Sequence, residues 1–346
     1  MRRLFKSLMA ASLWLLTPTV AAAALPPEPW RDPDLGQVVV EGAATSDRLW
    51  LLGGSGAVVE FERATGERRR IAEDVIDILH EGGRLWSVAA GADGVARVRD
   101  LLDPASDESA PAIGAPRALF SGPDGLGLVS TGGVARRGAD GWAGVPLTDP
   151  LAHGGVSAAA VAGGKLYVGL NAGEWGGGLR LIDLATGRSE IVGEHAAGSC
   201  DGVLSVECDP VADLFADPSR AGCIIAAAGL AHLSLSDGWV LRVCDGSVEA
   251  LQRGPAYPGA MSGMPDRHLA LTGLWPAASG WIGTREGRLL QPHDRLIDDM
   301  ERPPLREWAG LRINDDDPEF LVVLRSCCHG SVSDGLYEVL LAPIVR

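Results

Sequence analysis

The sequence predicts an all-β protein that folds as a single β-propeller. A unit of strand, glycine-containing turn and second strand recurs along the chain and is clearest in residues 166–187. Short runs rich in Val, Ile, Leu and Trp alternate with turn residues, and no long segment keeps a helical period. Residues 211–215 and 296–300 are candidates for only a turn or two of helix. Because one such unit is too small to bury its own core, it must pack against its neighbours, as propeller blades do.

The first 24 residues have the pattern of an export signal. Arg2, Arg3 and Lys6 precede a short apolar run, and the alanines at 21–24 supply small residues for cleavage. The apolar run is too short to span a bilayer, so we expect a signal peptide that is removed and no later membrane span. Residues 25–35 then form an extended lead-in and residues 36–346 the propeller domain. We expect the protein to be periplasmic or secreted.

The repeat divides the propeller domain into seven units of about 45 residues, the length of a four-stranded antiparallel blade. Degraded copies begin near Trp50, Trp86 and Trp281, whose large rings we expect to pack between blades. Residues 68–71 and 189–192 have the polar pattern of outer strands. The units are 36–72, 73–113, 114–148, 156–193, 204–251, 266–302 and 305–346.

A propeller must close its ring, and the two ends of the domain suggest how. The last unit ends soon after Leu341 and lacks an evident outer strand. Residues 37–41 can supply this strand, which would join the two ends of the ring and remove an exposed sheet edge. If residues 37–41 belong to the first blade instead, the alternative is a ring of six blades.

Residues 166–183 resemble a known type of propeller repeat. An aromatic residue, a branched residue and a glycine lead through a loop to Gly-Leu and a strand that ends in Asp, and residues 281–287 match the first half of this pattern. The pattern resembles the propeller repeats in sensor regions of bacterial two-component regulators. The resemblance implies a propeller and brings no catalytic residues. The shared positions, which we assign to the scaffold, are Leu166, Tyr167, Gly169, Leu179 and Asp183.

The charge of the chain limits its partners. The formal net charge of −15 at pH 7 becomes −18 when Arg2, Arg3 and Lys6 leave with the signal. Such a surface repels phosphate backbones, so we expect no nucleic-acid partner. It favours cations, cationic peptides or a basic protein, although solubility alone also explains an acidic surface. The partner is therefore an unknown protein or small-molecule ligand.

The chain has six cysteines, an even number that fits disulfide bonding in an exported protein. One pair brackets a short loop, a second begins and ends neighbouring strands, and the third is adjacent in sequence. The connectivity itself is left open by the sequence. The candidate pairs are Cys200 with Cys208, Cys223 with Cys244, and Cys327 with Cys328.

Residues 171–178 are an insertion that the clearest copy of the repeat has and the other copies lack. This insertion lengthens one hairpin loop and brings a carboxylate and an indole. Propellers bind ligands through loops on their faces and near the central channel. Asn171, Glu174 and Trp175 are therefore candidates for contact with a sugar, a peptide or a cation. The alternative is a glycine-rich bulge whose Trp packs on the next blade.

Two segments suggest metal chemistry. Asp315, Asp316 and Asp317 are adjacent carboxylates that offer oxygen ligands to Ca²⁺, but their spacing is not that of an EF-hand and a solvated turn is the simpler interpretation. The adjacent cysteines before His329 combine thiols with an imidazole, which suits zinc or copper. Adjacent cysteines rarely chelate one ion, however, and export favours their oxidation. We expect no cofactor, with Ca²⁺ as the exception to test.

No motif of a known catalytic chemistry is present. The sequence has no Gly-x-Ser-x-Gly elbow, no phosphate-binding Gly-Lys-Ser/Thr loop and no His-Glu-x-x-His pair, and its seven histidines are scattered. We expect a non-enzymatic propeller that binds a ligand or partner protein on one face. The alternative is an enzyme with a site in the central channel, such as a metal-assisted lyase or a lactone hydrolase. That alternative requires Asp, Glu and His side chains from several blades to converge on the axis.

Overall fold

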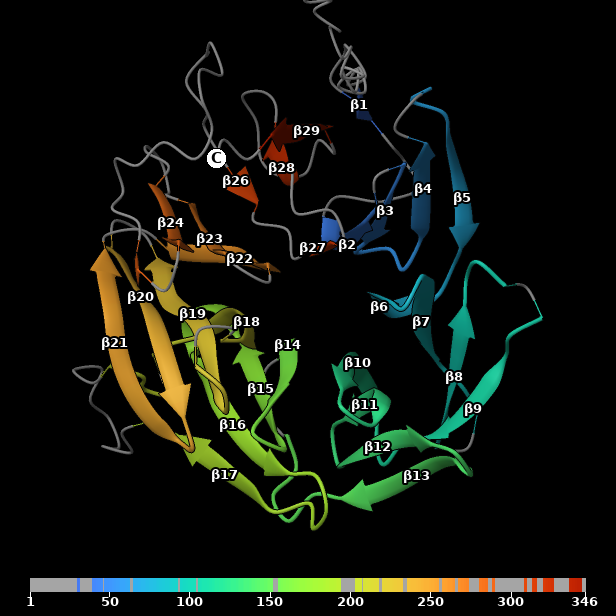
Figure 1. The fold of residues 1–346 in the computed structure, drawn as a ribbon, viewed down its shortest axis with the longest axis horizontal. Coiled ribbons are helices and arrows are strands. Elements are labelled where there is room, and N and C mark those ends of the chain that lie inside the picture. The colour runs from blue at the N-terminus through green and yellow to red at the C-terminus, as the bar shows by residue number, and fades with distance from the viewer. Residues whose placement is uncertain are drawn as a thin grey trace, which may run out of the picture.

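Antiparallel sheets surround a central axis in the computed structural model of this chain (Figure 1). The innermost strand of each sheet lies near the axis and the outermost strands form the rim. This arrangement is a β-propeller, so the all-β class predicted from the sequence is confirmed. The structure describes residues 30–31, 39–45, 47–62, 65–92, 94–103, 105–151, 155–193, 203–206, 208–217, 220–232, 235–254, 257–264, 267–273, 280–285, 288–289, 308–309, 313–315, 320–326 and 336–343.

The first four blades are meanders whose strands follow chain order from the axis to the rim. Blade 1 consists of β2 (Val39–Ala44), β3 (Arg48–Gly53), β4 (Val58–Glu62) and β5 (Arg68–Ala72). Blade 2 consists of β6 (Val75–Glu81), β7 (Arg84–Ala90), β8 (Val95–Asp100) and β9 (Glu108–Pro111). Blade 3 consists of β10 (Pro116–Gly122), β11 (Gly125–Ser130), β12 (Gly133–Gly138) and β13 (Gly141–Pro146). Blade 4 consists of β14 (Gly155–Ala162), β15 (Lys165–Asn171), β16 (Gly177–Asp183) and β17 (Ser189–Val192).

The remaining strands form three further sheets, so the described strands make seven sheets in all. Blade 5 consists of β18 (Val211–Ala216), β19 (Cys223–His232), β20 (Leu235–Cys244) and β21 (Ser247–Gly254). Blade 6 consists of β22 (Tyr257–Met264), β23 (Arg267–Gly273), β24 (Gly280–Arg285) and β25 (Arg288–Leu289). Blade 7 contains β26 (Trp308–Ala309), β28 (Phe320–Ser326), β29 (Leu336–Pro343) and β1 (Trp30–Arg31). The short strand β27 (Ile313–Asp315) runs parallel to β2.

The N-terminal segment completes the last blade, but not with the residues that the sequence suggested. β1 pairs with β29, with Trp30 opposite Tyr337. Residues 39–41 instead begin β2, whose Glu41, Gly42 and Ala43 are buried beside β3. The prediction that residues 37–41 close the ring is therefore wrong, because this apolar segment fits the crowded inner position of blade 1. Blade 1 keeps its inner strand, and the lead-in supplies the closing one.

The helical candidate at residues 211–215 is also wrong, because these residues form β18. The register of β18 against β19 shifts between Val211 and Asp213, which is the pattern of a β-bulge. The extra residue places Val211 and Leu214 both inside, which imitates a helical spacing in the sequence. In the described residues the one helical segment is η1 (Gly173–Trp175), and no helix among them is long and apolar enough to cross a membrane. Residues 1–24 and 296–300 lie outside the described residues.

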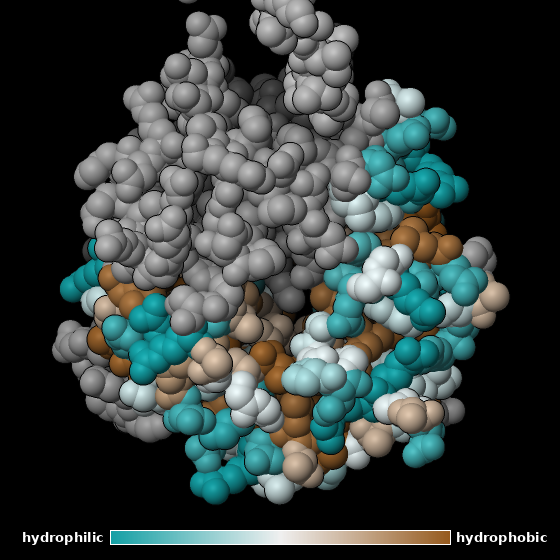
Figure 2. All heavy atoms as spheres, viewed as in Figure 1, coloured by the Kyte–Doolittle hydropathy of each residue, from teal (hydrophilic) through white to brown (hydrophobic). Residues whose placement is uncertain are grey.

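The hydrophobic core lies between blades rather than within them. Among the described residues, each of four apolar clusters combines side chains of two successive blades, from blades 1 and 2 round to blades 4 and 5. Trp50 joins the cluster of blades 1 and 2, and Trp86 that of blades 2 and 3, which confirms their predicted role. Nothing is described for the side chain of Trp281. Figure 2 shows hydrophobic residues between the hydrophilic residues of the visible rim.

Strand alternation explains how one blade serves two clusters. Successive side chains of a strand point to opposite faces of the sheet. In β15, Leu166 therefore packs towards blade 3 and the next residue, Tyr167, towards blade 5. Gly169 lies where a β-carbon would approach within 2.7 Å of the Val211 side chain in blade 5. These repeat positions belong to the scaffold, as the sequence suggested.

Polar bonds at the inner strands add to this packing. The buried carboxylate of Asp77 in β6 accepts a hydrogen bond from the backbone N–H of Leu119 in β10. The hydroxyl of Ser157 in β14 donates to the carbonyl of Val211 in β18 at 2.6 Å. Each bond joins neighbouring blades beside a bulge of an inner strand. The bulges thus expose backbone groups that the next blade can bind.

Blade 5 contains a disulfide that the sequence predicted. Cys223 and Cys244 lie opposite each other in the register of β19 and β20, with their Cα atoms 4.3 Å apart. Cys208 is also disulfide-bonded. Its predicted partner, Cys200, lies outside the described residues, as does the predicted pair of Cys327 and Cys328.

The core between blades can be tested by one truncation. Leu128 is fully buried between blades 2 and 3, so Leu128→Ala removes contacts from both and leaves a cavity. We expect it to lower the free energy of unfolding by about 2–5 kcal/mol, measured by chemical denaturation. The control is Leu102→Ala, whose side chain is 40% exposed and which should change stability by less than about 0.5 kcal/mol. Equal effects of the two variants would contradict the inter-blade core.

Candidate functional site

The inserted hairpin of blade 4 is a well-bonded loop. Between β15 and β16, η1 is closed by a hydrogen bond from the Ala172 N–H to the Gly176 carbonyl at 2.8 Å. The backbone N–H groups of Gly177 and Gly178 donate to the carbonyls of Val206 and Asp209, at 2.8 and 3.0 Å. The hairpin is therefore joined to the connection between blades 4 and 5.

Glycine is required at the base of this hairpin. Gly177 and Gly178 have φ angles of 145° and 78°, a region that side chains rarely adopt. A β-carbon on Gly177 would lie 2.0 Å from the Leu170 carbonyl oxygen. The run of glycines that the sequence shows is thus a consequence of the tight backbone path, and it gives the hairpin one defined shape.

The predicted ligand residues of this hairpin have different surroundings. Trp175 is 78% exposed, so the alternative that its ring packs on the next blade is wrong. Asn171 accepts a hydrogen bond from the Gly173 N–H through Oδ1 at 2.8 Å, which makes it part of the loop framework. Glu174 lies beside Trp175 in η1, and its side chain is not described. The hairpin therefore presents an indole to solvent on a well-bonded turn.

The other predicted site residues lie mostly outside the part of the chain that the structure describes. Asp315 is the last residue of β27, and Asp316 and Asp317 lie outside the described residues. Within the part of the chain that the structure describes, no three His, Cys, Asp or Glu side chains are arranged to hold a metal ion. Near the axis, the carboxylates of Asp77 and Asp213 accept hydrogen bonds from backbone N–H groups.

A second candidate site was not anticipated and lies between blades 1 and 2. It is a groove of about 740 Å³, here called the blade 1–2 groove, at the end of the blades where β2 turns into β3. In a meander this end is opposite to the one that carries the β15–β16 hairpin, so the two sites lie on opposite faces. Residues that line it include Arg48, Trp50, Arg69, Arg70, His80 and Leu102.

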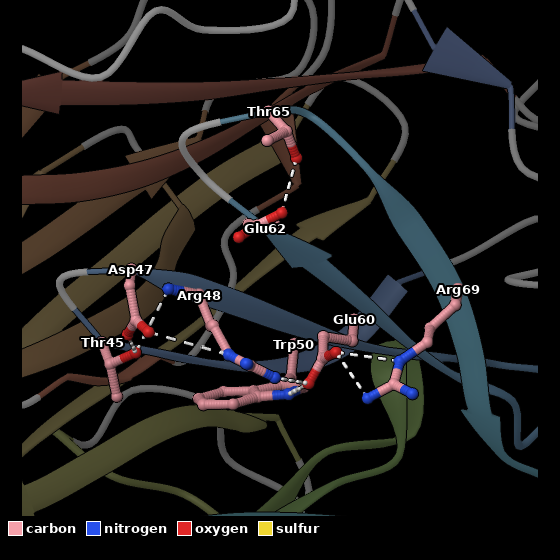
Figure 3. Close-up of polar contacts among 8 residues, drawn as sticks. All are labelled: Thr45, Asp47, Arg48, Trp50, Glu60, Glu62, Thr65 and Arg69. Carbon is pink, nitrogen blue, oxygen red and sulfur yellow. Dashed lines mark hydrogen bonds and ion pairs between the residues drawn. The ribbon is translucent and has the colours of Figure 1, made fainter.

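A buried carboxylate organises one wall of the groove. Glu60 is only 7% exposed and lies in β4 between Trp50 of β3 and Arg69 of β5, directly opposite both in the strand register. Its carboxylate accepts hydrogen bonds from the Trp50 indole at 2.9 Å, from Arg48 at 2.9 Å and from the Arg69 Nε at 3.0 Å. Figure 3 shows the two guanidinium groups approaching this carboxylate from opposite sides.

The electrostatics of this wall are set by the same bonds. Burial raises the pKa of Glu60, but the hydrogen bonds from Trp50, Arg48 and Arg69 outweigh it and leave this pKa below its ordinary value. The bond to Glu60 in turn raises the pKa of Arg48. Trp50 also stacks on His80 of blade 2, with ring centroids 5.6 Å apart. The ion pairs and the stack together fix the arginines at the junction of the two blades.

Sequence reasoning missed this groove although two signals were present. Glu60 is a carboxylate inside the apolar strand β4, and such a charge requires partners when it is buried. Residues 68–70 are three consecutive arginines in a chain of net negative charge. The sequence predicts an outer strand for residues 68–71, but it does not show that Arg69 lies opposite Glu60 in the strand register.

Comparisons with known proteins support the fold and no more. No protein-family model and no curated protein matches this chain in sequence. Among solved structures, the β-propeller domain of Cps50 (Swd1) from Myceliophteria thermophila is similar, with a TM-score of 0.53 and 12% identity over 91% of this chain and 99% of that one. The computationally designed Ika8 protein has a TM-score of 0.51 and 17% identity, over 87% of this chain and 82% of that one. YCF48 bound to D1 peptide has a TM-score of 0.50 and 12% identity, over 94% of this chain and 98% of that one.

The role of Glu60 predicts a pH-dependent stability. Because its folded pKa is lowered, its contribution is complete above the ordinary Glu pKa of about 4.3 and is lost as the pH falls through the folded pKa. We expect Glu60→Gln to lower the free energy of unfolding by about 1.5–3 kcal/mol at pH 7, and the gap to wild type to close in acid. Chemical denaturation between pH 3 and pH 7 measures both.

The matched control is Glu62→Gln on the same strand. Glu62 is exposed, and its carboxylate accepts a hydrogen bond from the Thr65 hydroxyl at 2.7 Å. We expect this variant to differ from wild type by less than about 0.5 kcal/mol. If Glu60→Gln is as stable as wild type at pH 7, the carboxylate does not hold the arginines as argued.

Proposed function

We propose that this chain is an exported, non-enzymatic propeller that binds a partner protein through the face bearing the β15–β16 hairpin. The observation that carries the proposal is Trp175, which is 78% exposed on a turn bonded to the neighbouring connection. Exposed tryptophans on preorganised loops are favoured anchors in protein interfaces, because the large ring buries much area and little conformational freedom is lost.

The chemistry of the face agrees with a polypeptide partner. Glu174 directly precedes the indole in sequence and offers a carboxylate for polar contacts at its rim, while Asn171 supports the turn through its hydrogen bond from the Gly173 N–H. The acidic chain favours a basic partner surface. One solved structure with the same fold, YCF48, is bound to the D1 peptide, so a propeller of this kind can bind a polypeptide segment. Export is supported by residues 1–24 and by the disulfide of Cys223 and Cys244.

A photo-crosslinking experiment tests the partner face. A photoreactive phenylalanine analogue at position 175 should crosslink a partner in intact cells, and mass spectrometry should identify it. With that partner purified, Trp175→Ala should weaken binding by about ten-fold or more, because truncation of an interface tryptophan removes a large buried area.

Position 140 provides the matched control. Asp140 is exposed in the β12–β13 turn, which lies on the opposite face, so the same analogue there should give no crosslink to this partner. Equal crosslinking from positions 140 and 175, or unchanged affinity of Trp175→Ala for the purified partner, would reject the proposal.

A further inference from the structure

We propose that the blade 1–2 groove binds an amphipathic carboxylate, with its carboxylate on the arginines and its apolar part against the leucines of blade 2. The site lies on the face opposite to Trp175 and does not depend on the proposed partner protein. Its ligand class follows from the exposed guanidinium groups, their preorganisation, the apolar lining and the size of the groove.

The groove presents a cluster of guanidinium groups to solvent. Three arginines line it, Arg48, Arg69 and Arg70. Each is paired with a carboxylate: Arg48 and Arg69 with Glu60, Arg48 also with Asp47, and Arg70 with Glu73. The side chains of these arginines are 41%, 69% and 46% exposed, so a ligand in the groove can reach them from solvent.

Glu60 orients the arginines before any ligand arrives. It binds Arg69 through Nε and Nη2, both at 3.0 Å, and Arg48 through Nη1 at 2.9 Å. A guanidinium has five N–H donors, so these bonds leave further donors on both residues for an anion. Because Glu60 itself is buried beneath the arginines, it fixes their positions without occupying the groove. Binding therefore requires little ordering of long side chains.

The remaining lining explains why the anion should carry an apolar body. Ile71 and Leu101 line the groove and pack against the core cluster of blades 1 and 2. Leu102 lines it as well and is 40% exposed, and few other large aliphatic side chains of the described residues are this exposed. A ligand that covers these residues removes apolar surface from water, which an inorganic anion cannot do.

The size of the groove fits a small organic ligand or the end of a peptide. Its volume of about 740 Å³ lies within the range of small-molecule sites, which is roughly 300–1,000 Å³. Guanidinium groups bind carboxylates through paired, charge-assisted hydrogen bonds. Fatty or aromatic acids and the C-terminus of a peptide with apolar last residues share this chemistry.

Calorimetric titration with defined probes tests the ligand class. Octanoate and 3-phenylpropionate represent free acids, and a tetrapeptide ending in Leu-Leu with a free C-terminus represents peptides. We expect at least one probe to bind and its amide, octanamide or the amidated peptide, to bind about ten-fold more weakly or worse. Which free-carboxylate probe binds more tightly identifies the source. Absence of binding for all probes, or equal binding of acid and amide, overturns the proposal, and so does inorganic phosphate binding as tightly as the best probe.

Arginine variants locate the binding site. Arg69→Ala and Arg70→Ala should each weaken the best probe by about ten-fold, and two variants guard against a folding defect in one of them. Arg97→Ala is the matched control, since Arg97 is a similarly exposed arginine that pairs with Asp107 in blade 2 and does not line the groove. A thermal melt of each variant checks that it is folded. Weakening by Arg97→Ala equal to that by Arg69→Ala and Arg70→Ala would place the site elsewhere and overturn the assignment.

Discussion

Apolar contact between successive blades is the interaction on which the rest of this structure depends. A four-stranded blade has two faces and no interior, so its apolar side chains leave water only when a neighbour covers them. Strand alternation supplies both faces at once, as Leu166 and Tyr167 do in β15. A ring satisfies this requirement for every blade, and the pairing of β1 with β29 links the two ends of the chain within blade 7. Polar side chains must therefore find hydrogen-bond partners without interrupting this packing.

Buried and half-buried carboxylates bind the arginine and tryptophan side chains that border this core. Glu60 accepts from Trp50, Arg48 and Arg69 within blade 1. Glu108 at the rim of blade 2 binds Arg137 and Trp142 of blade 3, and Arg137 also lies over the ring of Trp86. In blade 5, Asp217 binds Arg242, and this pairing outweighs the effect of burial and raises the pKa of the arginine. Each carboxylate accepts hydrogen bonds from N–H groups whose burial without a partner would be unfavourable. A tryptophan or arginine can therefore extend the apolar core towards the surface.

The sequence predicted the architecture well because its signals are local. Periodicity and glycine turns predicted the strand–turn–strand units that begin near Trp50, Trp86 and Leu166, and the spacing of Cys223 and Cys244 predicted a disulfide. The errors arose where the outcome depends on pairing between distant segments. Residues 211–215 have helical spacing only because a bulge in β18 interrupts the alternation, and the choice between residues 37–41 and β1 for the closing strand depends on blade 7. The groove was missed for the same reason, since Arg48, Glu60 and Arg69 become one cluster only when β3, β4 and β5 lie in register.

The two candidate sites depart from the repeated blade structure in different ways. The hairpin at Trp175 adds residues between two strands, so the sequence reveals it as an insertion and the scaffold is unchanged beneath it. The blade 1–2 groove adds no residues. It lies at the junction of two blades, where Trp50 stacks on His80. The arginines of the outer strand β5 line it there. A site of the second kind uses side chains that also hold the blades together, so its arginines are positioned by the core. A change in ligand affinity there should therefore be coupled to the stability of the junction, whereas a change at Trp175 should not.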